Sequence, residues 1–174
     1  MEGLNPEEQK VEEPVSNDHQ FLFTHSVVGL NNVLSYNQRD GLKKLSKTSH
    51  CKNRVEFIPG NHYTCQVGQD RLFAYNSSTL NCQMVFISSY GRTFKIKELA
   101  KTFTHRNLTC MVNIDDKQIF LIGGVDFYPE TTLSSVSRYT IAENSWDENM
   151  PALVVPRASS SGCYVGRNIF VFGG

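Results

Sequence analysis

The sequence predicts an all-β protein built from repeated antiparallel sheets of about four short strands each. The clearest observation is a phrase that occurs twice, fifty residues apart: Ile119–Gly124 reads IFLIGG and Ile169–Gly174 reads IFVFGG. A second observation is the aromatic content of 11 Phe, 7 Tyr and 1 Trp, which suits sheets that bury flat surfaces. A third is that no segment shows a sustained helical stripe of apolar residues with helix caps.

Strand-like phrases recur with a spacing of 47 to 53 residues along most of the chain. Three registers show this spacing: Leu22, Leu72, Ile119 and Ile169; Tyr36, Phe86 and Tyr139; and Leu42, Phe94 and Trp146. A repeat of this length indicates that each unit folds as one supersecondary element, and that successive units stack.

The registers place the strands in order along the chain. We expect strands near 20–28, 31–37 and 41–46, then 61–68, 70–76, 82–88 and 93–99, then 107–114, 117–123, 133–140 and 144–149, and finally 160–166 and 168–173. Tight polar turns join the first two strands of the later units, for example Gly68-Gln69-Asp70 and Gly166-Arg167-Asn168. Gly, Asn and Asp tolerate the left-handed backbone of such turns.

This pattern resembles the kelch repeat family. The residues that match its motif are Arg106, Gly123, Gly124, Tyr139, Trp146, Arg157, Gly173 and Gly174. The resemblance implies a kelch-type β-propeller, here incomplete, with about three four-stranded antiparallel blades and the first half of a fourth. The corresponding units are approximately 19–58, 59–105, 106–156 and a partial unit at 157–174. The first two units depart from the motif, because neither has the double glycine.

The first 18 residues differ in composition from the repeats. They contain five Glu and two Pro and few apolar side chains, so we expect residues 1–18 to form a disordered acidic segment before the repeat region 19–174.

The motif residues have physical roles in a blade. Each double glycine lets the backbone leave a strand with positive φ and makes space for a neighbour. Tyr139 and Trp146 offer flat surfaces for burial between blades. Arg106 and Arg157 precede the first strand of a unit, where a guanidinium can bind backbone carbonyls or a carboxylate between blades. The alternative for the arginines is exposed contact with a partner.

Three of the five cysteines stand two residues before a strand valine: Cys65, Cys110 and Cys163. We interpret them as small packing residues at one equivalent position on the first strand of each unit. A disulfide or metal site is the alternative, although no Cys-x-x-Cys or zinc-ligand spacing is present. We therefore predict no cofactor and no metal.

The balance of charged residues and the N-terminal sequence indicate the cellular compartment and the class of partner. Lys plus Arg and Asp plus Glu are both 17, which gives no overall field for nucleic acid or membrane. The N-terminus has no secretory signal and no apolar run reaches the length of a membrane span. We expect a cytoplasmic protein whose partner is another protein.

The resemblance implies a protein–protein interaction module, either a substrate-recognition adaptor for ubiquitin ligation or a cytoskeletal scaffold. The candidate surface is the connection at residues 125–132, where Phe127, Tyr128 and Glu130 combine two aromatics with an acid. The alternative is that both aromatics fold back into blade packing.

A propeller enzyme of the galactose-oxidase type is the competing function, and because no ligand or triad spacing is visible we predict that the chain is not an enzyme. An open arc has uncovered apolar faces, so the isolated chain is expected to self-associate or to be part of a longer propeller.

Overall fold

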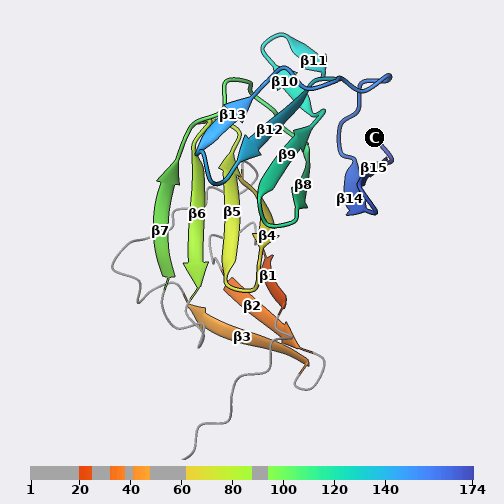
Figure 1. The fold of residues 1–174 in the computed structure, drawn as a ribbon. Helices are drawn as coiled ribbons and strands as arrows, with labels where there is room; N and C mark the ends of the chain where they lie inside the picture. The colour runs from red at the N-terminus through yellow and green to blue at the C-terminus, as the bar shows by residue number, and fades with distance from the viewer. Residues whose placement is uncertain (1–19, 25–31, 38–40, 48–61, 88–93) are drawn as a thin grey trace, which may run out of the picture.

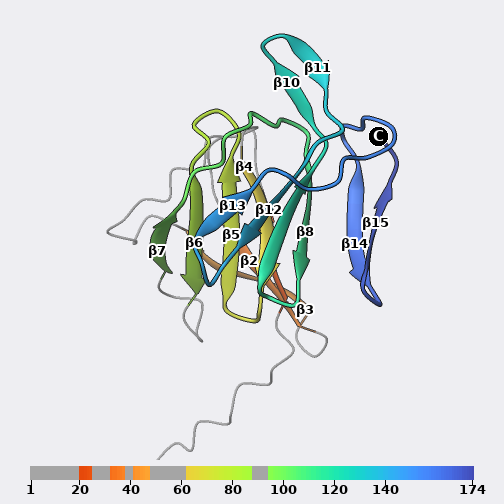
Figure 2. The ribbon, with the colours of Figure 1, turned by 45° about the horizontal axis from the view of Figure 1, so that its top comes forward.

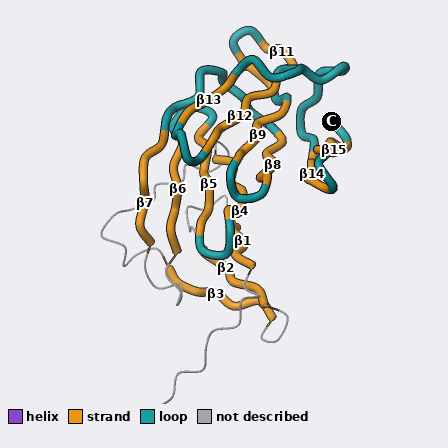
Figure 3. The backbone as a smooth tube through the Cα atoms, viewed as in Figure 1, coloured by secondary structure: helices purple, strands orange, loops and turns teal. Residues whose placement is uncertain are grey.

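The structure is a computed structural model that describes residues 20–24, 32–37, 41–47, 62–87 and 94–174. Strands, turns and loops make up all of these residues, and no helix occurs among them (Figure 3). The described part of the chain therefore includes no helix that could cross a membrane. The predicted disordered segment 1–18 lies outside the described residues.

The strands form antiparallel sheets that follow one another along the chain (Figure 1). The first sheet holds β1 (Gln20–Thr24), β2 (Asn32–Asn37) and β3 (Gly41–Lys47); the second holds β4 (His62–Val67), β5 (Arg71–Asn76), β6 (Cys82–Ile87) and β7 (Phe94–Leu99); the third holds β8 (Cys110–Ile114), β9 (Gln118–Ile122), β12 (Val136–Thr140) and β13 (Ser145–Asp147); and the fourth holds β14 (Ser161–Val165) and β15 (Asn168–Phe172). The strand order is β4-β5-β6-β7 in the second sheet and β8-β9-β12-β13 in the third. Each strand is therefore hydrogen-bonded to the strand of the same sheet that comes next in the sequence. The predicted all-β fold of successive antiparallel sheets is confirmed, and the sheets of the described residues do not close into a ring.

One predicted loop contains an additional hairpin. Residues 125–132 form β10 (Val125–Phe127) and β11 (Glu130–Thr132), a two-stranded sheet that projects beyond the end of the third sheet (Figure 2). Phe127 pairs with Glu130, so Tyr128 and Pro129 form the turn, and Asp126 Oδ1 accepts a hydrogen bond from the Tyr128 amide at 3.1 Å. Sequence reasoning missed this hairpin because strands of three residues are too short to show an alternating pattern.

The core lies between successive sheets, and β9 contributes to both of its parts. Ile119 and Leu121 point toward the second sheet, where they join a buried cluster with Phe73. Phe120 and Ile122 point to the opposite face and pack with residues of β14 and β15. Because side chains alternate across a strand, a strand with both faces buried carries a continuous apolar run. This explains the phrase IFLI.

Pairing in the hairpins corrects two of the predicted registers. Tyr139 lies opposite Trp146, but Phe86 lies opposite Lys95, whereas Phe94 lies opposite Ile87. Counted from the turn between the first two strands, the residues of the second sheet equivalent to Tyr139 and Trp146 are Val85 and Ile96. The spacing analysis was one residue off at Phe86, which places that side chain on the other face of the sheet, and two residues off at Phe94.

The cysteine alignment is corrected in the same way. Cys65 pairs with Phe73, and Cys163 pairs with the corresponding Phe170. Cys110 instead pairs with Ile122, which places it two residues earlier on its strand. The residue of β8 equivalent to Cys65 and Cys163 is therefore Val112. The prediction used the nearest valine as its reference, but the turn at the end of the strand sets the register.

Aromatic side chains join the second and third sheets. Trp146 is half-buried, with its ring centroid 5.1 Å from that of Tyr139 and 6.2 Å from that of Phe73. Its indole Nε1 donates to the carbonyl oxygen of Ala100 at 2.9 Å. One side chain thus contributes both apolar contact and a hydrogen bond to the other sheet's connection.

We predict that Trp146→Ala lowers the free energy of unfolding by about 3 kcal/mol, because it removes ring packing and a hydrogen bond together. Trp146→Phe is the matched control; it keeps most of the packing, so its loss should be nearer to about 1 kcal/mol, the usual contribution of one hydrogen bond. Urea unfolding of the three proteins measures both values. A loss below about 1 kcal/mol for the alanine variant would contradict the packing role.

Candidate functional site

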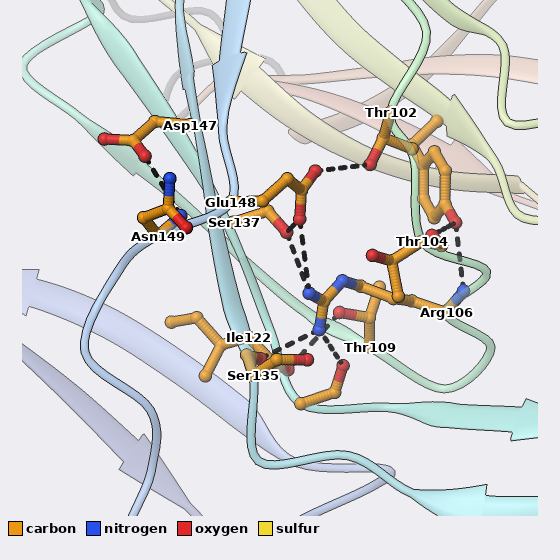
Figure 4. A network of polar contacts seen from close by, with 12 residues as sticks. Thr102, Thr104, Arg106, Thr109, Ile122, Ser135, Ser137, Asp147, Glu148 and Asn149 are labelled. Atoms are coloured by element: carbon orange, nitrogen blue, oxygen red, sulfur yellow. Dashed lines mark hydrogen bonds and ion pairs between the residues drawn. The ribbon is translucent and has the colours of Figure 1, made fainter.

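Arg106, in the connection between β7 and β8, is a buried side chain with several polar partners among the described residues. Its side chain is 1% exposed. One terminal nitrogen donates to the carbonyl oxygens of Gly123 at 3.2 Å and Ser135 at 2.8 Å, and the other donates to the Ser137 hydroxyl at 2.8 Å (Figure 4). The fork therefore holds the chain on both sides of the β10–β11 hairpin.

Glu148 supplies the opposing charge. Its Oε2 lies 3.7 Å from Nη2 of Arg106 and also accepts a hydrogen bond from Ser137, and its Oε1 accepts one from Thr102 at 3.1 Å. Burial lowers the pKa of Arg106, and the nearby Glu148 carboxylate opposes this shift. Desolvating a guanidinium is tolerable only with such partners. The ion pair joins the connection after β13 to the connection before β8.

The double glycine borders this network, because the carbonyl oxygen of Gly123 accepts one of the Arg106 hydrogen bonds. Gly123 and Gly124 have φ values of 61° and 107°. A Cβ atom at Gly123 would lie 2.3 Å from the carbonyl oxygen of Arg157, and one at Gly124 would lie 2.7 Å from that of Asn107. Both positions need glycine because of the backbone conformation and because neighbouring backbone approaches closely.

The fourth sheet repeats part of this arrangement. Arg157 donates from Nη1 to the carbonyl oxygen of Gly173 at 2.8 Å, as Arg106 does to that of Gly123. Gly173 and Gly174 also have positive φ, at 72° and 96°. The matched contacts show that the two arginine and double-glycine pairs occupy corresponding places in successive units.

The predicted partner-binding residues lie at the tip of the β10–β11 hairpin. Tyr128 is 92% exposed and Phe127 is 48% exposed, and Glu130 is also exposed. The structure therefore brings all three together on one projecting element, and neither aromatic is buried in the packing between sheets. At the base of the hairpin, Val125 is buried and exchanges two backbone hydrogen bonds with Asn107.

Further exposed apolar residues occur at the same end of the sheets. Antiparallel topology brings the connections 100–109, 123–135 and 148–160 to one end, and we call their outer surface the loop face. Besides the hairpin tip, its exposed large apolar residues are Phe103, Leu108, Val154 and Val155. Sequence reasoning missed these four. The signal that could have found them is that each apolar side chain stands in a connection close to a motif arginine.

Backbone hydrogen bonds fix the loop face to the sheets. Leu108 accepts from the Ser159 amide at 2.8 Å, Gly124 accepts from Leu133 at 2.8 Å, and Ser134 accepts from Leu153 at 2.8 Å. The three connections are thus bonded to one another, which holds the exposed side chains on a defined base.

Three of the four described cysteines contribute packing, whereas Cys163 is exposed, contrary to its predicted packing role. Cys82 and Cys110 are buried, Cys65 is half-buried and Cys163 is exposed, all as free thiols. Burial raises the pKa of the Cys65 and Cys82 thiols to about 12. Within the described ranges, no group of three or more His, Cys, Asp or Glu side chains gathers in a way that could hold a metal ion.

Comparison with known proteins yields structural neighbours only. No protein-family model matches the chain, and no curated protein matches it in sequence. The solved structure of YjhT, a kelch-type propeller, matches with a TM-score of 0.59 and 16% identity, over 70% of this chain and 36% of that one. A fungal alcohol oxidase of the AA5 family, solved in complex with copper, matches with a TM-score of 0.52 and 14% identity, over 76% of this chain and 30% of that one. The chain thus has a propeller-type fold and spans about a third of the length of these neighbours.

The prediction that the chain is not an enzyme is corrected by this comparison. One neighbour of the same fold is a copper alcohol oxidase, so the fold cannot serve to exclude catalysis. At 14% identity the likeness shows the fold alone and assigns no reaction to this chain.

We predict that Arg106→Met lowers the free energy of unfolding by about 3–5 kcal/mol, because it leaves the partly buried Glu148 carboxylate without its cation. Arg157→Met is the matched control; that arginine makes a single exposed side-chain hydrogen bond, so its loss should be below about 1 kcal/mol. Denaturant unfolding measures both. Adding Glu148→Gln to Arg106→Met should recover part of the loss, and equal losses for the two arginines would contradict the network's role.

Thiol labelling tests the packing of the cysteines. Iodoacetamide reacts with the thiolate, so brief labelling at pH 8 should modify the exposed Cys163 and leave Cys65 and Cys82 unmodified, because their raised pKa keeps them protonated. Peptide mapping by mass spectrometry locates the label, and labelling in denaturant is the control in which all three react. Early modification of Cys82 would contradict its burial.

Proposed function

We propose that the sheets are blades of a kelch-type propeller and that the chain is a protein-binding module whose loop face contacts the partner. The observation that carries this proposal is the cluster of exposed aromatic and apolar side chains in the connections at one end, with Tyr128 92% exposed at the tip of a hairpin. Large aromatic side chains held on a fixed base are the usual anchors of protein interfaces.

The kelch assignment is supported by the repeated arginine and glycine contacts. Arg106 with Gly123 and Arg157 with Gly173 form the same hydrogen bond in two successive units. A shared contact of this kind is a stronger sign of repetition than shared letters, because it also requires the same backbone path.

The chemistry of the loop face favours a protein over a charged polymer. The chain carries equal numbers of acidic and basic residues, 17 of each, and the hairpin tip combines two aromatics with Glu130. A nucleic-acid surface would need clustered basic side chains around its aromatics. Phe127 and Tyr128 instead offer apolar area with one hydroxyl, which fits a pocket on a protein.

The hairpin is also suited to this role mechanically. Its base is fixed by Val125 and Asn107, and the chain on either side of it is held by the buried guanidinium of Arg106. Binding through such a pre-ordered element loses little conformational entropy, which leaves more of the contact energy for affinity. The resemblance to kelch proteins suggests a ubiquitin-ligase adaptor or a cytoskeletal scaffold, and the identity of the partner distinguishes these two roles.

Site-specific crosslinking tests the proposal. A photo-crosslinking amino acid at position 128 should capture a partner in cells, whereas the same group at Lys117, in the turn at the opposite end of the sheet, should not capture it. With the captured protein purified, Tyr128→Ala and Phe127→Ala should each weaken binding by about tenfold or more, as expected for interface anchors.

Thr131→Ala, an exposed change on the same hairpin, is the matched control and should leave affinity nearly unchanged. Unchanged affinity in both aromatic variants, with the crosslink mapping instead to Lys117, would contradict binding through the loop face.

A further inference from the structure

The β10–β11 hairpin carries an aromatic ring and an acid directly opposite each other. Phe127 of β10 pairs with Glu130 of β11, so their side chains lie side by side on one face of the hairpin. Asp126 and Thr131 form the next pair and therefore lie on the other face. We call Phe127 and Glu130 the ring–acid pair.

The stability of the hairpin does not explain the ring–acid pair. Cross-strand pairs that stabilise antiparallel strands join two aromatics, an aromatic and a β-branched residue, or two opposite charges. A carboxylate beside an aromatic ring belongs to none of these classes. The face of the ring is negative, so it attracts a cation and not a second anion. The pair is therefore suited to a ligand outside the hairpin.

Both members of the pair are available to such a ligand. Phe127 is 48% exposed and Glu130 is exposed, on a hairpin that projects beyond the third sheet (Figure 2). Within the part of the chain that the structure describes, neither side chain makes an ion pair, a hydrogen bond or a ring contact. Asp126, in contrast, already accepts a hydrogen bond from the Tyr128 amide.

The charge of the hairpin indicates the sign of the ligand. Residues 123–135 contain two acids, Asp126 and Glu130, and no Lys, Arg or His. Two acids without a base repel phosphate groups, so this element does not suit nucleic acid or an anionic membrane surface. They attract a cationic group, and the neighbouring ring selects a cation with a flat face.

We propose that the ring–acid pair binds an arginine side chain of the partner protein. The guanidinium is planar, so it stacks on the Phe127 ring while its terminal nitrogens donate to the two carboxylate oxygens of Glu130. The compact ammonium of lysine has neither the flat face nor the fork. The inference rests on the proposed function, to which it adds the chemistry of the partner: an arginine beside the pocket that receives Tyr128.

The ring and the acid act together in this site. An ion pair at an exposed surface is weak, because water screens both charges and the side chains must be ordered. A guanidinium stacked on Phe127 loses water from one of its faces, which strengthens its attraction to Glu130. The two contacts therefore bind one arginine better than either contact alone.

Titration of the full chain with N-acetylarginine amide tests the site by nuclear magnetic resonance of the ¹⁵N-labelled protein. N-acetylcitrulline amide, which has nearly the same shape without the charge, is the matched probe, with sodium chloride added to equalise ionic strength. The arginine probe should shift the amides of Phe127 and Glu130 about threefold more than the citrulline probe does. The amide of Lys117, at the opposite end of the sheet, should not distinguish the two probes.

Three variants locate the effect. Glu130→Gln and Phe127→Leu should each reduce the difference between the two probes to about half or less, because each removes one of the two contacts. Asp126→Asn is the matched control. It removes the same charge from the same hairpin but on the other face, and it keeps an oxygen that can accept from the Tyr128 amide, so most of the difference should remain.

Equal shifts from the arginine and citrulline probes would overturn the proposal, and this comparison stands even if a variant fails to fold. Equal effects of Asp126→Asn and Glu130→Gln would overturn it too, because the response would then report only the overall charge of the hairpin. So would N-acetyllysine amide shifting the same amides as far as the arginine probe, because the site would then lack preference for a guanidinium.

The same measurements separate this inference from the proposed function, because the titrations need no partner. Arginine-specific shifts at the hairpin, with no protein captured by the crosslinker at position 128, would support the ring–acid pair and contradict the proposed function. A captured partner that loses affinity with Tyr128→Ala but not with Glu130→Gln would overturn the ring–acid pair and leave the proposed function standing.

Discussion

The buried guanidinium of Arg106 is the interaction on which the arrangement of the loop face depends. Three segments outside its own connection end near it: the residues that follow β9, the start of β12 and the connection after β13. Each brings carbonyl, hydroxyl or carboxylate oxygens that would otherwise need other partners at this crowded end of the sheet. The carbonyl oxygens of irregular backbone need hydrogen-bond donors when they are buried. The guanidinium supplies these donors, and apolar side chains cannot.

Burial of both faces of β9 sets the second constraint. Ile119 and Leu121 pack on one side, and Phe120 and Ile122 pack on the other. A sheet with two apolar faces gains stability only between two neighbours, so each sheet here depends on the next. The same requirement explains why glycine is needed at Gly162, where a Cβ atom would lie 2.7 Å from the Cys110 sulfur of the adjoining sheet.

Sequence reasoning was most accurate where local chemistry decides structure. The double glycines and the polar turns located the strands, because turn residues act within a few positions. It was less accurate where strand pairing decides which residues of successive sheets are equivalent. Phe86 and Cys110 were assigned to positions that the hairpin registers give to Val85 and Val112. Glu148 escaped notice entirely, since its role depends on a contact with a residue 42 positions earlier, Arg106. The exclusion of catalysis went furthest beyond the sequence, because missing motif spacing cannot exclude a site assembled by the fold.

In the proposed protein-binding role, the hairpin β10–β11 separates recognition from stability within a few residues. Its base is held by Val125, Asn107 and the close-packed Gly124, but its turn at Tyr128 and Pro129 touches little of the sheet. Substitutions at the turn therefore cost the fold almost nothing, while they change the most exposed part of the proposed binding surface. The tip is consequently a natural position for diversification, where new binding specificity can be selected on an unchanged frame.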